Sequence, residues 1–430
     1  MGIVKIAMIG AGIRGTYGYA PYIYENPNQS KIVSVVEPKK GRRDLFAHQY
    51  NIQENQVFES IEEFLKGEKI ADAAIIASND DSHYYNAKLL LEKGYDVLLE
   101  SPVANTLDRL VKLKDLSEKY SDKVFMTCHI LRYNEFFNKL KKIVDDESLG
   151  ELISIQHNEN IGYQHFVHSY TRGNWRNQSD TSPLILNKSC HDLDILMYLT
   201  GSKCRKIASF GKLKHMNNEH FRGNMGENCF ICSVEEQCPY SAKKIYLKYD
   251  RYINHAVHIN PTKENLEQIL QKGPYGRCVY RCDNNVVDNM VSILEFENGV
   301  TATFNLSAFT KECDRTIKLM FSHGEVGGSL LKNEIKIKRF AQQEEETIDI
   351  AQNLNLYREE DTKLLKDFIN LVDKKENTKS KYACSVKDAI ESHIVAFASE
   401  YSRISEEVVY IKDFFEEAVY MTNEIEETLL

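Results

Sequence analysis

The fold is decided by residues 4–15, Val-Lys-Ile-Ala-Met-Ile-Gly-Ala-Gly-Ile-Arg-Gly, where an apolar run leads directly into three glycines. The apolar run predicts a buried strand over residues 4–9, and the residues that follow can form a helix through Tyr24. A glycine at position 10 permits a tight turn, one at 12 permits close approach of a pyrophosphate, and one at 15 lets helix and strand pack closely. The N-terminus of such a helix offers N–H groups and partial positive charge to phosphates. This order therefore predicts a dinucleotide-binding Rossmann unit.

A second expected strand, residues 32–36, ends at Glu37. An acidic side chain there can accept hydrogen bonds from the adenosine ribose hydroxyls and repels a 2′-phosphate, which favours NAD over NADP. Cations that follow directly can instead serve the 2′-phosphate of NADP, or form the solvated start of a helix, as charge runs usually do. The cations are Lys39, Lys40, Arg42 and Arg43.

Further apolar strands are expected at residues 73–77 and 97–99, with a helix over 84–93 between them. Alternation of apolar strands with helices predicts a parallel sheet that is covered on both faces. Ligands of such sheets lie beyond the carboxyl ends of the strands. The predicted cofactor-binding residues are Gly10, Gly12, Ile13, Arg14, Gly15, Glu37, Ser78, Asn79, His83, Glu100, Ser101 and Pro102.

Length and charge restrict the class of protein. A chain of 430 residues is long enough for two domains, and its net charge of −9 argues against a nucleic-acid partner. It has no apolar run of membrane-spanning length, and its start lacks the basic region and cleavage site of a secretory signal. We therefore expect a cytoplasmic protein without a membrane partner, whose ten cysteines are thiols or metal ligands.

Other motifs match one family pattern. Ser-Asn-Asp-x-x-His occupies residues 78–83, and Glu-Ser-Pro follows a Leu-Leu strand end at 100–102. With the glycine turn, these motifs make the sequence resemble the Gfo/Idh/MocA oxidoreductases, named for glucose–fructose oxidoreductase and inositol dehydrogenase. The resemblance covers nearly the whole chain apart from an insertion at about 212–280. It continues through Arg132-Tyr133, Gly173–Arg176, His191–Asp194 with Gly201, Phe296–Gly299 and a helix around Ala389–Arg403.

The resemblance implies an α/β plus α+β fold of two domains. Residues 1–125 would form the NAD(P)-binding Rossmann domain with its parallel sheet. Residues 126–430 would form an α+β domain with a large, mostly antiparallel open sheet, which frames the substrate and pairs subunits into a homodimer or homotetramer. C-terminal helices at about 357–430 can pack back on the Rossmann domain. Alternating or β-branched runs independently predict strands at 153–157, 291–296, 301–305 and 316–321.

The activity that the resemblance implies is hydride transfer between nicotinamide and a secondary hydroxyl or keto group of a sugar, inositol or related polyol. Oxidation of an alcohol also needs a base for the hydroxyl proton. Many family members use the lysine of a Glu-Lys-Pro motif, with an Asp and a His four residues apart on a helix. This chain has Ser101 where that lysine belongs and Asn187 where that aspartate belongs.

A substitute is predicted on the helix that starts near residue 184. Lys188 and His191 stand three residues apart, hence on one face and within mutual reach. A lysine held near an imidazole and partly desolvated has its pKa lowered toward neutrality. We therefore predict Lys188 and His191 as the proton-handling pair, with Asn187 orienting the substrate. The plain alternative is a solvent-exposed lysine and a structurally satisfied histidine.

Substrate contacts are expected from two segments. Residues 158–176 are rich in polar groups and aromatic rings, which suits a polyhydroxylated ligand, although a surface loop can look the same. Arg132 and Tyr133 follow an expected strand at 123–127, and Arg132 fits a structural ion pair equally well. The predicted substrate-binding residues are Arg132, Tyr133, Tyr163, His165, Trp175 and Arg176, although Trp175 can simply be core.

The insertion contains Cys229, Cys232 and Cys238, with Cys278 and Cys282 beyond. The first pair has the spacing of zinc ligands, but no second Cys-x2-Cys follows. A structural zinc site, free thiols and a redox pair all remain open. The insertion is expected to act as a lid or to extend an interface.

Two rival functions remain open. Some relatives keep NAD bound and eliminate a leaving group through a transient keto-sugar, so a lyase or glycosidase is one alternative. A catalytically silent NAD(P)-binding sensor or scaffold is the other, because the usual lysine and aspartate are missing. Net NADH accumulation would identify a dehydrogenase, and cleavage without it the redox-cycling enzyme.

Overall fold

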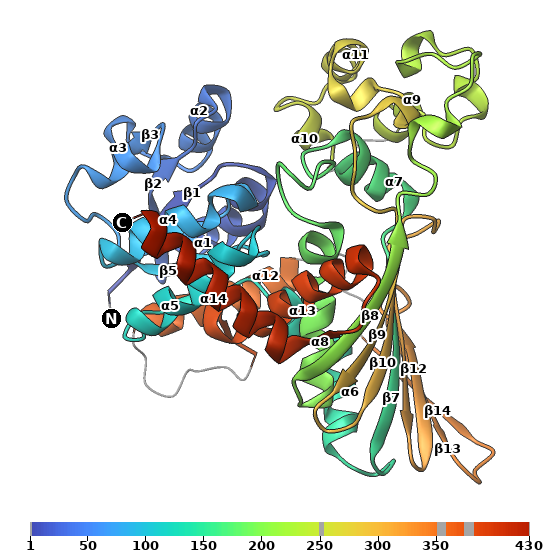
Figure 1. Ribbon diagram of the computed structural model, residues 1–430. Helices are drawn as coiled ribbons and strands as arrows, with labels where there is room; N and C mark the ends of the chain where they lie inside the picture. Colours follow the sequence, from blue (N-terminus) through green and yellow to red (C-terminus); the bar gives the residue numbers. More distant parts are fainter. Residues whose placement is uncertain (1, 249–252, 351–357, 374–381, 430) are drawn as a thin grey trace. The chain divides into compact units, whose positions relative to one another are not determined.

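The computed structural model describes residues 2–248, 253–350, 358–373 and 382–429 (Figure 1). They fall into two compact units. The first unit is Met1–Asn138 with Gln352–Ile394 and Phe415–Leu430, and the second is Lys139–Ala351 with Val395–Phe414. Parts of the C-terminal region expected to be helical, residues 357, 374–381 and 430, lie outside the described residues. In the part of the chain that is described, no helix has the length and apolar character needed to cross a bilayer.

The first unit contains a seven-stranded sheet in the order β15-β6-β5-β4-β1-β2-β3. All neighbours pair in parallel except β15 with β6. The order 3-2-1-4-5-6 of the parallel strands is that of a dinucleotide-binding Rossmann sheet, which confirms the predicted fold class. The strands are β1 (Val4–Ile9), β2 (Ser30–Val36), β3 (Val57–Phe58), β4 (Ala73–Ile76), β5 (Asp96–Leu99), β6 (Phe125–Thr127) and β15 (Cys384–Ser385).

Helices cover this sheet because its central strands are apolar on both faces; every residue of β4 is buried. Leu364, Leu365 and Phe368 of α12 also belong to the core of this unit. The helices and helical turns (η) are η1 (Arg14–Tyr19), α1 (Ala20–Glu25), α2 (Lys40–Gln49), η2 (Glu54–Gln56), α3 (Ile61–Leu65), η3 (Asp80–Ser82), α4 (His83–Glu92), α5 (Leu107–Lys119), η4 (Ile130–Tyr133) and α12 (Arg358–Val372). Three more, α6 (Glu135–Asp145), α13 (Val386–Ser405) and α14 (Ile411–Leu429), have residues in both units.

The helix expected through Tyr24 is not one regular α-helix. Residues Arg14–Tyr19 form a wider π-helical segment, and an α-helix begins only at Ala20. Pro21 explains the break, because proline lacks the N–H that a continuing α-helix needs but fits the first turn of a new one.

The second unit contains a nine-stranded sheet in the order β14-β13-β12-β11-β7-β10-β9-β8-β16, seen as a long curved sheet in Figure 1. Its pairs are antiparallel except for β7 with β10, as the mostly antiparallel prediction expects. The strands are β7 (Leu152–Asn160), β8 (Cys204–Lys212), β9 (Asn289–Phe296), β10 (Thr301–Ser307), β11 (Asp314–Phe321), β12 (Gly324–Ser329), β13 (Glu334–Arg339), β14 (Glu345–Asp349) and β16 (Val409–Tyr410).

One face of this sheet is buried, and burial alternates along β7, β9, β10 and β11. After β7 the chain forms α7 (Tyr163–Phe166), η5 (Val167–Arg172) and then α8 (Leu184–Thr200). The serine hydroxyls of Ser209, Ser292 and Ser399 hydrogen-bond to one another on the buried face, 2.8–3.0 Å apart.

The insertion connects β8 to β9 and is built of short helical pieces. These are η6 (Asn218–His220), η7 (Cys229–Ile231), η8 (Glu235–Gln237), α9 (Ala242–Tyr246), α10 (Asn254–Val257), α11 (Lys263–Lys272), η9 (Pro274–Gly276) and η10 (Val279–Arg281). Its core includes Ile245, Tyr246, Leu266 and Leu270, each at most 3% exposed. The insertion is therefore a folded element with its own buried residues.

Candidate functional site

The glycine turn after β1 has the geometry that its residues predict. Gly10 has φ +101°, and a Cβ there would lie 2.6 Å from the Ala77 carbonyl oxygen. A Cβ on Gly15 would lie 2.2 Å from the Gly10 carbonyl oxygen. A Cβ on Gly12 would meet no atom within 4 Å. Two of the glycines are thus required by the turn itself, whereas Gly12 leaves open space, which fits a pyrophosphate approaching the backbone.

Glu37 lies at the end of β2 and is 5% exposed. Its Oε2 accepts a hydrogen bond from the Ala11 N–H at 3.0 Å, and its Oε1 accepts one from the Lys39 N–H at 2.9 Å. The carboxylate therefore fixes the glycine turn against the next loop. Each carboxylate oxygen can accept a second hydrogen bond, so capacity for ribose hydroxyls remains.

Two of the basic residues after Glu37 have local partners. Lys40 forms an exposed ion pair with Asp44 at 2.5 Å. The guanidinium of Arg43 donates to the carbonyl oxygens of Glu37 at 2.5 Å and Pro38 at 3.1 Å. The exposed Lys40 pair matches the alternative in which the charge run is the start of a solvated helix, α2, whereas the Arg43 side chain is mostly buried against the loop after β2.

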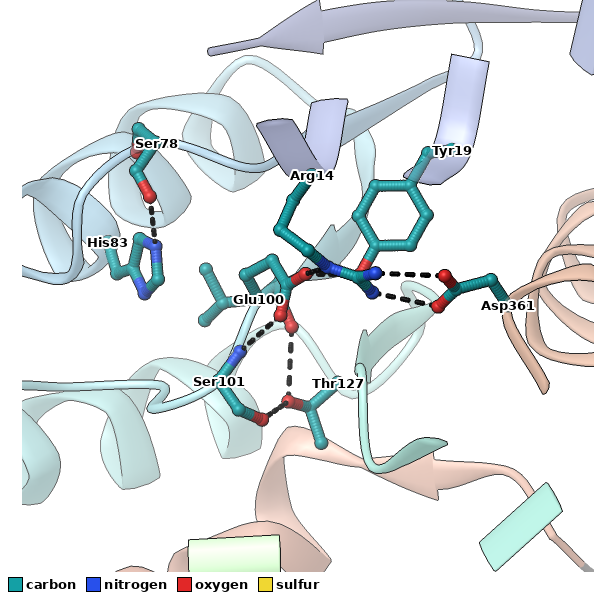
Figure 2. A network of polar contacts seen from close by, with 9 residues as sticks. Arg14, Tyr19, Ser78, His83, Glu100, Ser101, Thr127 and Asp361 are labelled. Carbon is teal, nitrogen blue, oxygen red and sulfur yellow. Dashed lines mark hydrogen bonds and ion pairs between the residues drawn. The ribbon is translucent and has the colours of Figure 1, made fainter. Parts of the chain in front are cut away.

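Arg14 holds a polar network together (Figure 2). Its Nε donates to Glu100 Oε1 at 2.6 Å, and its two Nη atoms donate to the Asp361 carboxylate at 2.8 and 2.7 Å. The Tyr19 hydroxyl donates to Glu100 as well. Burial acts to raise the pKa of Glu100, but the Arg14 charge and the Tyr19 hydrogen bond outweigh it and lower that pKa. Glu100 is therefore an ionised anchor.

The segment 100–102 carries Ser101 in place of a lysine. The Ser101 N–H donates to Glu100 Oε2 at 3.0 Å, and its hydroxyl lies 3.3 Å from the Thr127 hydroxyl, which donates to the Leu99 carbonyl oxygen at 3.1 Å (Figure 2). Ser101 thus has polar partners in Glu100, directly after β5, and in Thr127 of β6.

His83 connects two of the predicted cofactor segments. Its Nδ1 lies 2.8 Å from the Pro102 carbonyl oxygen and its Nε2 lies 3.1 Å from that of Ser78. The side chain is 2% exposed. Because both ring nitrogens face carbonyl oxygens, His83 connects the segments that follow β4 and β5, and Figure 2 shows its contact with Ser78. Beside it, the Ser78 hydroxyl lies 2.7 Å from that of Ser82, which donates to the Asn79 carbonyl oxygen at 2.8 Å.

The structure places Tyr133 in the apolar core of the first unit, where it is 2% exposed and packs beside Tyr382. This corrects the expectation of a substrate contact, because a ring covered on all sides cannot reach a ligand. Arg132, the preceding residue on η4, is half-buried.

In the second unit, Lys188 of α8 belongs to a buried ionic network. Its Nζ lies 3.2 Å from Glu159 Oε1, and Glu159 Oε2 lies 2.9 Å from Arg315 Nε. Arg315 also forms a forked pair with Asp192, at 2.7 and 3.1 Å. His157 Nε2 lies 2.8 Å from the same aspartate. The network joins β7, β11 and α8.

The neighbours of Asp192 keep its carboxyl group ionised. Asp192 is fully buried, and burial alone would raise its pKa, but the charge of Arg315 and the hydrogen bond from His157 lower the pKa well below its usual range. A carboxylate beside a lysine favours the ammonium form of that lysine. Glu159 therefore opposes the neutral Lys188 that the sequence predicts.

Lys188 acts on the imidazole of His165. Burial, followed by the positive charge of Lys188, holds the pKa of His165 well below its ordinary value. His165 is therefore a neutral imidazole at pH 7. His191, the predicted partner, is half-buried on α8.

Asn187 lies among aromatic side chains. The Tyr170 hydroxyl donates to Asn187 Oδ1 at 2.9 Å, and the Tyr170 ring lies 6.1 Å from the His165 ring and 6.5 Å from the Trp175 ring. The structure thus brings together Asn187, His165 and Trp175. Tyr170 was missed, although it lies inside the aromatic segment that the sequence singles out.

Arg176 and Tyr163 are engaged with neighbours. Arg176, predicted to contact the substrate, forms a forked ion pair with Asp283 of the insertion, at 2.9 and 3.0 Å. The Tyr163 hydroxyl accepts a hydrogen bond from the Gln164 amide at 2.9 Å, and its ring meets the Tyr240 ring edge-on.

Glu159, Arg315 and Asp192 were not predicted as site residues. Two of them have a local signal in the sequence. Glu159 lies two residues after His157 on a strand with one buried face, and Asp192 lies four residues after Lys188 on the helix. Arg315 carries no comparable local signal.

Two family models cover most of the chain. One, described as the oxidoreductase family with an NAD-binding Rossmann fold, matches residues 4–128, and the other, its C-terminal alpha/beta domain, matches residues 141–398. The chain belongs to the Gfo/Idh/MocA oxidoreductase family. This confirms the resemblance inferred from the glycine turn and the later motifs.

Individual members of the Gfo/Idh/MocA family are only distantly similar. Inositol 2-dehydrogenase of Corynebacterium glutamicum is 24% identical over 203 residues, 46% of this chain and 55% of that protein. The chain spans about half the length of the first curated relatives that it matches.

Solved structures share the fold over nearly the whole chain. The WlbA dehydrogenase of Bordetella pertussis, solved with NADH and UDP-GlcNAcA, has a TM-score of 0.65 at 13% identity and covers 95% of this chain and 99% of its own. A super-repressor mutant of Gal80p from Saccharomyces cerevisiae has a TM-score of 0.69 at 13% identity, covering 96% and 99%.

Proposed function

We propose that the protein is an NAD-dependent dehydrogenase that exchanges a hydride with a secondary hydroxyl or keto group of a sugar, inositol or related polyol. The observation that carries the proposal is the glycine turn with open space at Gly12 and with Glu37 anchored beside it. Glu37 and the local pairing of Lys40 and Arg43 support NAD over NADP, because a buried carboxylate repels a 2′-phosphate. Bound NAD would supply the nicotinamide that accepts or donates the hydride.

Proton handling is assigned to α8. Lys188, held as an ammonium by Glu159, would donate a hydrogen bond to the reacting oxygen and stabilise negative charge on it. His191 would take up or return the hydroxyl proton. Neutral His165 stands beside Lys188 as an alternative acceptor.

Asn187, oriented by Tyr170, would hold a substrate hydroxyl, and the Trp175 ring would lie against the C–H face of a sugar ring. Arg132 stays a proposed contact to nicotinamide or substrate. The mix of one amide, one ammonium and aromatic faces suits a polyhydroxylated ligand rather than an apolar one.

A homo-oligomer is part of the proposal. On the face of the large sheet opposite to α8, Phe210 is 61%, Val291 40% and Ile293 53% exposed. Phe210 pairs directly with Val291 in the β8–β9 register, so these side chains form one patch. Exposed apolar patches of this kind mark association surfaces.

The test has two parts. Calorimetry should show binding of NAD⁺ at least ten times tighter than NADP⁺, and a panel of sugars, inositols and sugar acids should give reduced nicotinamide that absorbs in the near ultraviolet. Lys188→Met and His191→Asn should bind NAD⁺ as the parent does but lose about 10²–10⁴-fold in kcat, the range of general acid–base and oxyanion contributions. Absence of binding for both dinucleotides would refute the proposal.

A non-enzymatic sensor is the second candidate, because the chain is also similar to a galactose/lactose metabolism regulatory protein of Kluyveromyces lactis and, in fold, to the super-repressor mutant of Gal80p. It predicts NAD⁺ binding with no turnover of any panel member, and equal ligand responses in the parent, Lys188→Met and His191→Asn.

A further inference from the structure

Four cysteines of the insertion line one cavity of about 220 Å³. Cys229, Cys232 and Cys238 come from one loop, and Cys278 comes from a second segment 40 residues later. Cys282, one helical turn beyond Cys278, does not line the cavity, and its thiol donates to the Cys278 carbonyl oxygen at 3.4 Å. All of them are free thiols rather than disulfides. The fold therefore brings four cysteine side chains to the wall of one cavity.

Backbone pairing brings the two segments together. Asn228 pairs with Arg277 in an isolated antiparallel bridge, and the Cys278 N–H donates to the Glu227 carbonyl oxygen at 2.8 Å. The Asn228 amide donates to the carbonyl oxygen of Leu270 at 3.0 Å, at the end of α11. The position of Cys278 beside Cys229 is thus fixed by hydrogen bonds that do not involve the sulfurs.

A buried cation faces the same cavity. Arg172 lines it and is 1% exposed. Its Nε and Nη2 donate to the carbonyl oxygens of Arg277 and Tyr240, both at 2.8 Å, and Nη2 also lies 3.5 Å from Cys229 Sγ. The guanidinium also interacts with the Tyr246 hydroxyl, while its Nη1 is buried without an acceptor at hydrogen-bonding geometry. Glu235, a carboxylate that lines the same cavity, pairs with Lys243 instead of Arg172.

A guanidinium buried without an anion is costly, so this cavity favours negative charge. Thiolates bound to a metal centre supply that charge. Cys229 Sγ already accepts hydrogen bonds from the Ala242 N–H at 3.3 Å and from Arg172. Donors of this kind around cysteine sulfur are a recognised influence on iron–sulfur centres.

Sulfur spacing distinguishes a single ion from a cluster. Four thiolates around one zinc ion at about 2.3 Å in a tetrahedron lie about 3.8 Å from one another. Across the residues that the structure describes, no three of these sulfurs come within 4.8 Å of one another. In an iron–sulfur cluster the four thiolates bind different irons, so they surround a larger space and do not meet at one point.

We propose that Cys229, Cys232, Cys238 and Cys278 hold a [4Fe–4S] cluster, with Arg172 as its buried counter-cation. The chain pattern Cys-x2-Cys-x5-Cys-Pro with a distant fourth cysteine is consistent with four thiolate ligands, three from a compact loop. The inference replaces the zinc site that the sequence left open. It is independent of the proposed dehydrogenase activity, because none of these residues carries a role in it.

The cluster would stabilise one specific part of the second unit. Arg172 ends η5, the segment that also contains Tyr170, the partner of Asn187. Holding Arg172 in place therefore holds the turn that orients Tyr170. The cluster acts here as a structural centre, and no electron-transfer step is assigned to it.

The test is the metal content of the full-length chain, purified without oxygen and reconstituted with equal amounts of ferrous and ferric iron and with sulfide. About four irons and four acid-labile sulfides per chain are expected, with broad visible absorption that bleaches on reduction with dithionite. One zinc per chain without sulfide, or no bound metal after reconstitution, would overturn the proposal.

Serine variants locate the site. Cys229→Ser, Cys232→Ser, Cys238→Ser and Cys278→Ser should each lose most of the iron and the visible absorption. Cys282→Ser, the matched control, should keep both. Arg172→Gln should shift the reduction midpoint of the cluster or its retention, and Arg172→Lys should recover part of the change. Equal iron loss in Cys282→Ser and Cys278→Ser would contradict the assignment, and circular dichroism of each variant identifies any that fail to fold.

Discussion

The two units hold their charged groups in different ways. In the first unit, Glu37 accepts hydrogen bonds from backbone N–H groups two and 26 residues away, and the Arg14 side chain is still 35% exposed. In the second unit, Asp192, Glu159 and Arg315 are at most 8% exposed and join three separate elements. A cofactor turn can thus be built mainly from backbone, whereas the Lys188 site depends on buried ions that must compensate one another.

The largest effect is expected from breaking the buried network. Arg315→Met removes the buried cation that Asp192 and Glu159 share and should lower the free energy of unfolding by about 3–5 kcal/mol. Urea unfolding measures this change. Arg205→Met, which removes an exposed ion pair with Glu295, is the control and should cost at most about 1 kcal/mol. Equal losses in the two variants would remove the distinction between the units.

The next effect is a pH dependence in the second unit. Burial lowers the pKa of His168 to about 4 in the folded protein, against about 6.5 when unfolded. Since the unfolded chain binds the proton first, this group destabilises the fold as pH falls from about 6.5 to 4, by up to about 3 kcal/mol. The stability of His168→Asn should therefore fall less steeply than that of the parent between about pH 6.5 and 4. A profile for His168→Asn parallel to that of the parent would refute the burial argument.

Two glycines of the first unit give a matched pair. Gly12→Ala meets open space, so it should leave the melting temperature unchanged yet weaken NAD⁺ binding by about tenfold or more, or about 1.4 kcal/mol. Gly15→Ala must displace the Gly10 carbonyl, so it should also lower stability by about 1–3 kcal/mol. Calorimetry and thermal melts separate the two, and unaltered affinity in Gly12→Ala would argue against pyrophosphate at this turn.

The smallest effect is expected at the charge run after Glu37. Lys40→Ala removes an exposed pair with Asp44 and should change stability by less than about 0.5 kcal/mol and NAD⁺ affinity by less than twofold. A large loss of NADP⁺ binding in this variant would show that the run serves a 2′-phosphate after all.

Local sequence patterns were enough to predict the elements around the glycine turn of the first unit. The predicted strand at residues 4–9 coincides with β1, and Glu37 follows β2 directly. These features depend on hydrophobic runs and glycine chemistry within about 40 residues, which a sequence displays openly.

The substrate half was predicted less well because its partners are distant in the chain. Asp192 meets Arg315 across 123 residues, and Arg176 meets Asp283 across 107. Lys188 lies on helix α8 and is partly buried, as the sequence predicts, but its anion, Glu159, became visible only when β7 was placed beside α8. Tyr133 is buried in the core because residues of α12, more than 200 positions later in the chain, belong to the same core cluster. No local pattern around Tyr133 indicates that contact.

The way the insertion joins the sheet has one more consequence. Lys212 at the end of β8 and Asn289 at the start of β9 are paired directly, so the chain leaves and re-enters the sheet at the same rung. Residues 213–288 are thus the greatly enlarged loop of a β-hairpin, and loop length costs stability only slowly. Excising them for a two-residue turn would keep every strand pairing of the large sheet, while Arg172 and Arg176 would lose the partners that the insertion provides.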